Sequence, residues 1–295
     1  MSLKPKKNYC GISARTMTGK NPKIIEFYKM SGSGNDFIII DNRDLSLNVG
    51  NLPDFARAVC RRQISVGADG LVLIEPSKTA DFKWQFFNSD GSVAEMCGNA
   101  ARCVARWAFL QGIAGEKLSF ETVAGIVNAE VRENVPKVKL TDPSRVIPGK
   151  NIALAGKEFI LDIVDTGVPH AVNFVDNIES CSVVDWGSKI RHHDCFQPKG
   201  TNANFAAVLD RHKMKVRTYE RGVEDETLAC GTGAVAAVLA AAERGLVDSP
   251  VDTIVRSGEI LRIYFIRKGD RFEEIYLEGK IKIIYQGFLF EEAYK

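Results

Sequence analysis

The sequence lacks long apolar runs and dense basic segments, and each absence excludes a class of protein. The longest apolar stretches, such as residues 234–242, fall far short of the roughly 20 residues that a membrane-spanning helix needs. With 39 basic residues against 37 acidic ones the net charge is +2, without the basic stripe typical of a nucleic-acid-binding protein. We therefore expect a small-molecule partner, and neither nucleic acid nor a membrane.

The cysteines and histidines lack the spacings of a metal site. No CxxC pair occurs, and the four histidines show neither HExxH nor zinc-finger spacing, so the sequence predicts no metal ligands. The seven cysteines are an odd number, without the density of a disulfide scaffold or an apparent secretory signal. This usage favours a reducing cytoplasm.

Short strand-like runs dominate the chain after a basic leader. Residues 1–23 contain no acidic side chain and no clear apolar period, so we expect a flexible N-terminal extension. Helical spacing occurs at residues 52–62, 100–110 and 233–243, and most other segments alternate like strands. Many antiparallel-looking strands with few helices predict an α+β fold rather than a doubly wound sheet.

One motif occurs twice. Cys97 and Cys230 each begin a Cys-Gly-x-x-Ala sequence that leads into an alanine-rich helix, and about half of the ordered chain separates them. This duplication predicts two related domains, each presenting a cysteine at a helix start. A site between such domains would hold two thiols that face each other.

Two thiols at helix starts suit inversion of a carbon centre. Free backbone N–H groups and the helix dipole favour the thiolate of a cysteine in this position. Gly98 and Gly231 keep side-chain bulk away from these amides, so the two helix starts could hold one carboxylate between them. Epimerisation needs a base on one face of the carbon and an acid on the other, which Cys97 and Cys230 would supply.

Other polar residues are ambiguous when taken alone. His170 follows a turn, where a lone histidine is more often a turn or core residue than a catalyst. Glu220 and Arg221 would suit the ammonium and carboxylate of an amino acid, and would equally suit a solvated surface pair. Three asparagines lie in glycine-rich or turn segments, where this residue is common for its backbone geometry: Asn35, Asn88 and Asn202.

Three motifs in order give the chain a family resemblance: KMSGSGNDF at 29–37, NSDGSVAEMCGN at 88–99 and ERGVEDETLACGTG at 220–233. Together they resemble the diaminopimelate epimerases, over about residues 24–290. The resemblance implies two pseudo-symmetric domains, each a mainly antiparallel sheet wrapped round a central helix, with the active site in the cleft between them. We expect the first domain to comprise residues 24–141 with 281–295, and the second residues 142–280.

The resemblance also implies roles for single residues. Cys97 and Cys230 would be the acid/base pair, with His170 beside the first thiol and Glu220 beside the second. It further implies no pyridoxal phosphate, no metal, and a homodimer. The implied substrate-binding residues are Asn35, Asn88, Gly98, Asn99, Asn202, Glu220, Arg221, Gly231 and Thr232.

Two positions depart from the pattern found in much of the family. Val168 stands where an asparagine commonly precedes Pro-His, and Gly70 stands where a glutamine can follow the Gly-x-Asp loop. Val168 cannot donate a hydrogen bond, so these departures bear on recognition of the distal part of the substrate.

The activity implied is epimerisation of LL-2,6-diaminopimelate to meso-diaminopimelate, in lysine and peptidoglycan biosynthesis. The nearest alternative is a relative of the same fold that acts on another amino acid, such as histidine or hydroxyproline. A non-catalytic amino-acid-binding protein would keep the carboxylate cradles without needing both cysteines. A thiol-redox protein would use a Cys97–Cys230 disulfide as a functional state.

Overall fold

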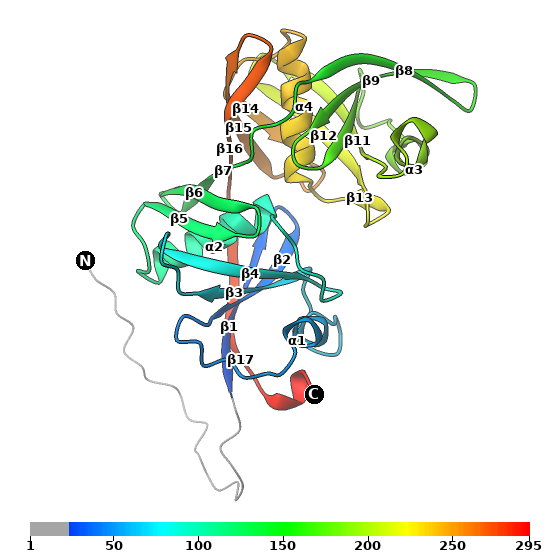
Figure 1. The fold of residues 1–295 in the computed structure, drawn as a ribbon. Helices are drawn as coiled ribbons and strands as arrows, with labels where there is room; N and C mark the ends of the chain where they lie inside the picture. The colour runs from blue at the N-terminus through cyan, green and yellow to red at the C-terminus, as the bar shows by residue number, and fades with distance from the viewer. Residues whose placement is uncertain (1–23) are drawn as a thin grey trace, which may run out of the picture.

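The structure, a computed structural model, describes residues 24–295, so the extension predicted over 1–23 lies outside the described residues. Figure 1 shows two bodies, a lower one from the first part of the chain and an upper one from the later part. Strands predominate in both bodies, and each encloses one long helix. This arrangement confirms the predicted α+β class.

The lower body is a sheet that curls round helix α2. Its strands pair in chain order, with β2–β3 and β4–β5 parallel and the other neighbours antiparallel. The buried alanines of α2 let β1, β2, β6 and β7 approach closely. The elements are β1 (Ile25–Gly32), β2 (Asn35–Asp41), α1 (Leu52–Val59), β3 (Gly70–Glu75), β4 (Phe82–Asn88), α2 (Gly98–Leu110), β5 (Lys117–Thr122), β6 (Gly125–Arg132) and β7 (Val135–Lys139).

The upper body repeats the plan round helix α4. Every residue of α4 from Gly233 to Ala242 is buried, as expected of a helix that strands surround. The β10–β11 and β12–β14 pairs are parallel, and the remaining pairs are antiparallel. The elements are β8 (Ile147–Leu154), β9 (Lys157–Asp165), β10 (Pro169–Phe174), α3 (Val183–His192), η1 (Asp194–Phe196), β11 (Asn202–Asp210), β12 (Lys213–Glu220), β13 (Asp225–Thr227), α4 (Gly231–Glu243), β14 (Val251–Ile254), β15 (Ile260–Lys268) and β16 (Arg271–Gly279).

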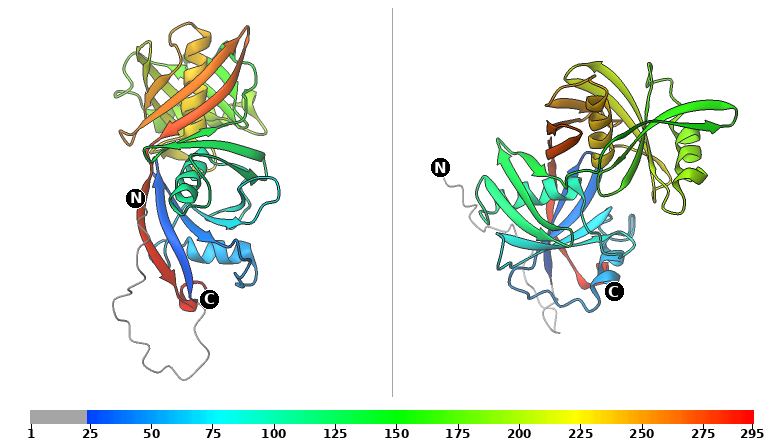
Figure 2. Two further views of the ribbon diagram at one scale, coloured as in Figure 1. Left: turned by 90° about the vertical axis from the view of Figure 1, so that its left-hand side faces the viewer. Right: turned by 45° about the horizontal axis from the view of Figure 1, so that its top comes forward.

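Two strand connections join the bodies. Strand β16 of the upper body pairs with β7 of the lower one, with Leu277 opposite Val138. The chain then runs down through β17 (Lys282–Leu289), which pairs with β1, before the final turn η2 (Glu291–Ala293). Figure 2 shows this return from the side, with β17 and β1 next to each other at one edge of the lower body. The central helices therefore share a continuous framework of hydrogen-bonded strands.

The sequence did not predict β5, β8, β13 or α3, and it placed the end of α1 at residue 62 instead of Val59. Helix α3 was missed because its buried face is narrow, comprising Val183, Gly187 and Ile190. Gly187 is required there by packing: a Cβ at this position would lie 2.3 Å from the Cβ of Tyr219. Among residues 24–295, no helix has the length and apolar character needed to cross a membrane.

Candidate active site

The two central helices begin at the junction between the bodies, and each begins with a cysteine. Cys97 is the N-cap residue of α2, and Cys230 is the N-cap residue of α4. A Cβ added to the next residue, Gly98 or Gly231, would lie 3.1 Å from the same atom, Cδ2 of Leu277. The two helix starts therefore converge on one side chain of β16.

Backbone N–H groups point at both sulfur atoms. The N–H of Gly233 donates to Cys230 Sγ over 3.4 Å, and Thr232 Oγ1 lies 3.5 Å from the same sulfur. Burial raises the pKa of the Cys97 thiol, and hydrogen bonds from the backbone of Ala100 and Asn99 offset only part of that rise. The expectation that a helix start favours the thiolate is therefore outweighed by burial.

The two thiols also influence each other. Burial raises the pKa of Cys230, and the negative charges of Glu220 and Cys97 raise it further. Glu220 raises the pKa of Cys97 as well. Ionisation of one thiol therefore disfavours ionisation of the other, and burial together with the nearby carboxylate favours the neutral form of both thiols.

Glu220 is the last residue of β12 and lies close enough to both thiols to raise their pKa values, and Arg221 follows it in the chain. Burial raises the pKa of Glu220, and the negative charge of Asp69 from the lower body adds to the rise. The backbone N–H of Arg221 donates to Asn202 Oδ1 over 2.8 Å, and Asn202 Nδ2 donates to Pro169 O over 3.2 Å. These contacts gather residues from β10, β11 and β12 at one edge of the upper body.

His170 is fully buried in β10 and hydrogen bonds to Asn204. Asn204 Oδ1 accepts a hydrogen bond from Thr218, so its Nδ2 faces the ring and donates to His170 Nδ1 over 3.1 Å. The ring proton consequently sits on Nε2, which has no hydrogen-bond partner among residues 24–295. Burial lowers the pKa of His170 to about 3, and the positive charge of Arg221 contributes, so the ring is neutral near pH 7.

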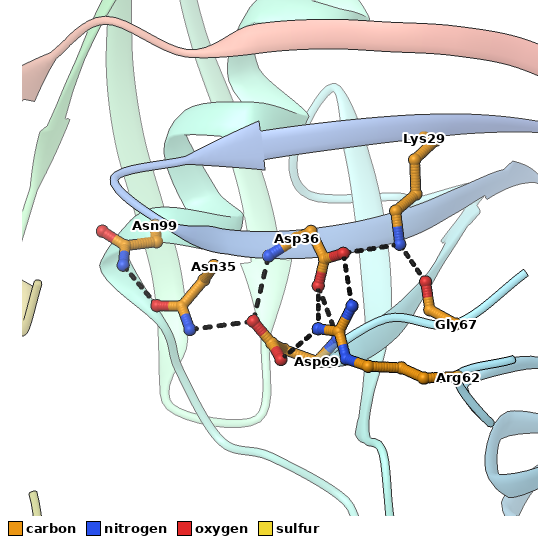
Figure 3. A network of polar contacts seen from close by, with 7 residues as sticks. All are labelled: Lys29, Asn35, Asp36, Arg62, Gly67, Asp69 and Asn99. Atoms are coloured by element: carbon orange, nitrogen blue, oxygen red, sulfur yellow. Dashed lines mark hydrogen bonds and ion pairs between the residues drawn. The ribbon is translucent and has the colours of Figure 1, made fainter. Parts of the chain in front are cut away.

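Asn99 and Asn35 lie together at the start of α2. Asn99 Nδ2 donates to Asn35 Oδ1 over 2.6 Å, as Figure 3 shows. Asn99 Oδ1 lies 3.6 Å from a Cβ placed on Gly231, so it reaches the start of the other helix. The side chain of Asn88 is exposed and donates to Ser92 Oγ over 2.9 Å. Within residues 24–295 it makes no hydrogen bond to another of the predicted substrate-binding residues.

Gly70 lies opposite Asn88 in the β3–β4 pairing, and no larger residue fits there. A Cβ at position 70 would lie 2.5 Å from Phe86 Cε2 and 2.8 Å from Phe87 O. A glutamine at this position would therefore require the strands to move.

Sequence reasoning missed three polar residues at this junction: Asp69, Arg102 and Asn204. Asp69 lies in the same Gly-x-Asp loop that drew attention to Gly70, and Arg102 lies one helical turn after Gly98. Asn204 shares a strand with Asn202, two residues earlier on the same face. Within residues 24–295, no group of three or more His, Cys, Asp or Glu side chains is arranged to hold a metal ion.

Known proteins of similar fold include a phenazine biosynthesis protein of the PhzF family from Bacillus anthracis. It covers 90% of this chain and 99% of its own, with a TM-score of 0.70 and 15% identity. A hydroxyproline epimerase from Agrobacterium vitis, with bound trans-4-hydroxy-L-proline, covers 91% and 93%, with a TM-score of 0.67 and 15% identity. These similarities establish the fold alone.

Similarity in sequence is much closer to one family. The diaminopimelate epimerase of Aquifex aeolicus is 48% identical over 280 residues, which cover 91% of this chain and 99% of that protein. The diaminopimelate epimerase of Archaeoglobus fulgidus is 42% identical over 278 residues, covering 90% and 96%. The sequence profile described as diaminopimelate epimerase matches residues 27–146 and 163–284. The chain therefore belongs to the diaminopimelate epimerase family of isomerases.

Proposed function

We propose that the protein interconverts LL- and meso-2,6-diaminopimelate in the cytoplasm, for lysine and peptidoglycan biosynthesis. Family membership supports the substrate, since the relatives that match most of the chain carry this name. The observation that carries the chemistry is the convergence of two cysteine-capped helix starts on Leu277. Such an arrangement offers one proton acceptor and one proton donor to a single carbon.

The reaction requires two proton transfers at the α-carbon. The backbone N–H groups at the two helix starts hold the α-carboxylate, aided by Asn99 and Thr232. One cysteine, as the thiolate, takes the α-proton, and the electron pair left on carbon is delocalised into the carboxylate. The opposite thiol then gives its proton to the other face and becomes a thiolate. The negative charge of an ionised Cys97 raises the pKa of Cys230, so a state with both thiols ionised is disfavoured.

The neighbouring ionisable groups would assist proton transfer to and from the thiols. Glu220, whose pKa is raised by burial, accepts the proton of Cys230 more readily than an ordinary carboxylate would. His170 offers a buried, unpartnered Nε2–H, which can donate to a thiolate or to the substrate. Asn35, Asn88, Asn202 and Arg221 would hold the remainder of the substrate.

The protein is further proposed to have two domains and to form a homodimer. Residues 24–141 with 281–295 would form one domain, because β17 pairs with β1, and residues 142–280 would form the other. The proposed dimer surface is β17, which carries an apolar surface on an edge strand. The exposed large hydrophobic residues of β17, together with the residue after the strand, are Ile283, Ile284, Tyr285, Phe288 and Phe290.

Isotope exchange tests the two-base reaction. Starting from LL-diaminopimelate in heavy water, we expect the first meso product to be deuterated at its inverted carbon, with slower labelling of unreacted substrate. The lag arises because the abstracting thiol holds the original proton and returns it when the carbanion collapses backwards. Mass spectrometry of the separated isomers measures both. Substantial unlabelled product in the earliest conversion would exclude two separate bases.

Cysteine variants provide the control. Cys97→Ser and Cys230→Ser should each reduce epimerisation by several orders of magnitude, because a serine hydroxyl is far too weak an acid to replace the thiol. Cys195→Ser changes an exposed cysteine away from the helix starts and should retain full activity. Assays with histidine and trans-4-hydroxy-L-proline alongside diaminopimelate would show whether another amino acid is preferred.

A further inference from the structure

Two asparagine amides stand in series between a guanidinium and a carboxylate. Arg102 Nη2 donates to Asn99 Oδ1 over 2.5 Å, and Asn99 Nδ2 donates to Asn35 Oδ1 over 2.6 Å. Asn35 Nδ2 then donates to Asp69 Oδ2 over 3.0 Å. Figure 3 shows the part of this chain from Asn99 to Asp69, where it meets the cluster of charged residues.

The two ends of the chain determine how both amides are oriented. A guanidinium can only donate hydrogen bonds, and a carboxylate can only accept them. Asn99 and Asn35 must therefore turn their oxygens toward Arg102 and their nitrogens toward Asp69. Each oxygen is engaged within the chain, whereas each nitrogen keeps one further N–H. Both asparagines can consequently offer N–H donors to a ligand, which suits an anionic group.

Arg102 is held by the protein in a position where its charge has no direct counter-ion. It is fully buried, and it donates to Ser33 Oγ over 3.0 Å and to Gly98 O over 3.3 Å. No ion pair of the described residues includes Arg102, and its Nη1 has no hydrogen-bond partner there. Burying an unpaired guanidinium costs free energy, so its retention suggests a role beyond packing.

At the other end, Asp69 belongs to a cluster of four charged side chains with Arg62, Asp36 and Lys29. Arg62 Nη2 bridges Asp69 Oδ1, at 2.8 Å, and Asp36 Oδ1, at 2.7 Å. The buried Lys29 pairs with Asp36 over 2.8 Å and also donates to Gly67 O. Arg62 occupies Asp69 Oδ1, whereas Oδ2 accepts from Asn35 Nδ2 and from the backbone N–H of Asp36 (Figure 3).

The amide chain also lies beside the second helix start. Asn99 Oδ1 is 3.6 Å from a Cβ placed on Gly231, and a Cβ on Gly34, next to Asn35, would lie 2.7 Å from Leu228 Cβ. Leu228 precedes Cys230 by two residues. The oriented amides therefore border the space between the two thiols.

We infer that Asp69 and Arg102 are positioning residues that orient the amides of Asn35 and Asn99, so that both present N–H donors to the substrate carboxylate. This inference rests on the proposed function, because it concerns how that substrate is held. Asp69 and Arg102 do not contact the substrate in this scheme. They act by excluding the flipped amide orientations, which would present oxygen to the carboxylate.

The test compares ligands that differ only in charge at the reacting end. Each end alone orients both amides, so the double variant Asp69→Asn with Arg102→Gln is needed: both ends can then present oxygen or nitrogen, and Asn35 and Asn99 become free to flip. We expect the affinity for diaminopimelate to fall about tenfold or more, as for loss of a charge-assisted contact. The affinity for the analogue whose reacting carboxylate is a carboxamide should stay unchanged, as measured by calorimetry.

Asp36→Asn is the matched control, because the Asp36 side chain pairs with Lys29 and Arg62 in the same charged cluster and makes no hydrogen bond to the side chain of Asn35 or Asn99 in the described part of the chain. A merely structural role of the cluster would make Asp36→Asn as harmful as the double variant, and would reduce the affinities for carboxylate and carboxamide equally. Either result would overturn the inference. Wild-type protein that neither binds nor epimerises diaminopimelate would instead refute the proposed function.

A second double variant restores one fixed end. Asp69→Asn with Arg102→Lys keeps a side chain that can only donate to Asn99, so it should retain the preference for carboxylate over carboxamide. The single variant Asp69→Asn, in which Arg102 still orients both amides, should retain it as well. Equal preference in the folded Asp69→Asn/Arg102→Gln and Asp69→Asn/Arg102→Lys variants would contradict the inference.

Discussion

His170 shows how one buried side chain can make the stability of the protein depend on pH. Its neighbour Asn204 is oriented by the hydroxyl of Thr218, and the ring is completely shielded from water. Burial lowers the pKa of the ring to about 3, with a contribution from Arg221, whereas an unfolded histidine titrates near 6.5. The unfolded chain therefore binds a proton at a higher pH than the folded protein does.

The sign of the effect follows from this difference. As the pH falls below 6.5, His170 binds a proton in the unfolded state but not in the folded state. The folded state therefore loses stability until the pH approaches 3. Wild-type protein should lose about 1.4 kcal/mol per pH unit more than His170→Gln does over this window. Urea unfolding of both proteins at several pH values measures the difference.

His192→Gln, which changes an exposed histidine, is the control and should keep the wild-type pH dependence. Parallel pH profiles for wild type and His170→Gln would show that His170 does not resist protonation in the folded protein.

At the scale of elements, an ion pair between a buried carboxylate and an arginine at the surface holds the end of helix α4 to strand β9. Asp162 is fully buried, and Arg244 donates to its two oxygens over 2.6 and 2.7 Å. The backbone N–H of Gly149 donates to Asp162 Oδ1 over 2.9 Å. Helix α4 begins with Cys230, so this pair anchors the far end of the helix that presents the second thiol.

Removing the arginine should leave an uncompensated buried charge. Arg244→Leu is expected to lower the free energy of unfolding by about 3 kcal/mol or more, because the Asp162 carboxylate would lose its partner. The double variant Asp162→Asn with Arg244→Leu should recover much of this loss, since a neutral amide can still accept from Gly149. Chemical denaturation of the single and double variants measures the coupling between them.

A surface ion pair serves as the comparison for these single and double variants. Arg211 and Asp248 are 2.5 Å apart, but both side chains are more than half exposed. Arg211→Leu should therefore change stability by less than about 1 kcal/mol. Equal losses for Arg211→Leu and Arg244→Leu would show that burial of Asp162 does not matter.

At the scale of the whole molecule, the β17 edge is the surface that we propose joins two copies. Strand β17 pairs on one side with β1, and Ile284 and Phe288 are 51% and 43% exposed on one face of the strand. Contiguous exposed apolar side chains on an edge strand favour association. The continuity of β17 with β1 would let such an interface stiffen the lower body.

We expect sedimentation velocity to show a dimer, and Ile284→Lys to convert it to a monomer by placing a charge in the apolar surface. Ile147→Lys is the matched control: Ile147 is 58% exposed on β8, at the other edge, where the exposed apolar residues are isolated. A dimer that survives Ile284→Lys but is lost in Ile147→Lys would place the interface on β8 instead.

The sequence by itself determined the features that depend on neighbouring residues. Alternation predicted most strands, and the two Cys-Gly motifs before alanine-rich stretches predicted the two central helices and their cysteine starts. These features are local, because capping and side-chain alternation depend on residues a few positions apart. The order of three motifs was enough to indicate the family.

Only the tertiary structure decided what surrounds each of these residues. It brought the two helix starts to Leu277, turned the expected lowering of the thiol pKa into a rise through burial, and joined Arg102 to Asp69 through two amides. It also revealed α3, whose small apolar face is completed by Tyr219 of another strand. Burial and contacts between distant segments depend on how the whole chain packs, and no local pattern records them.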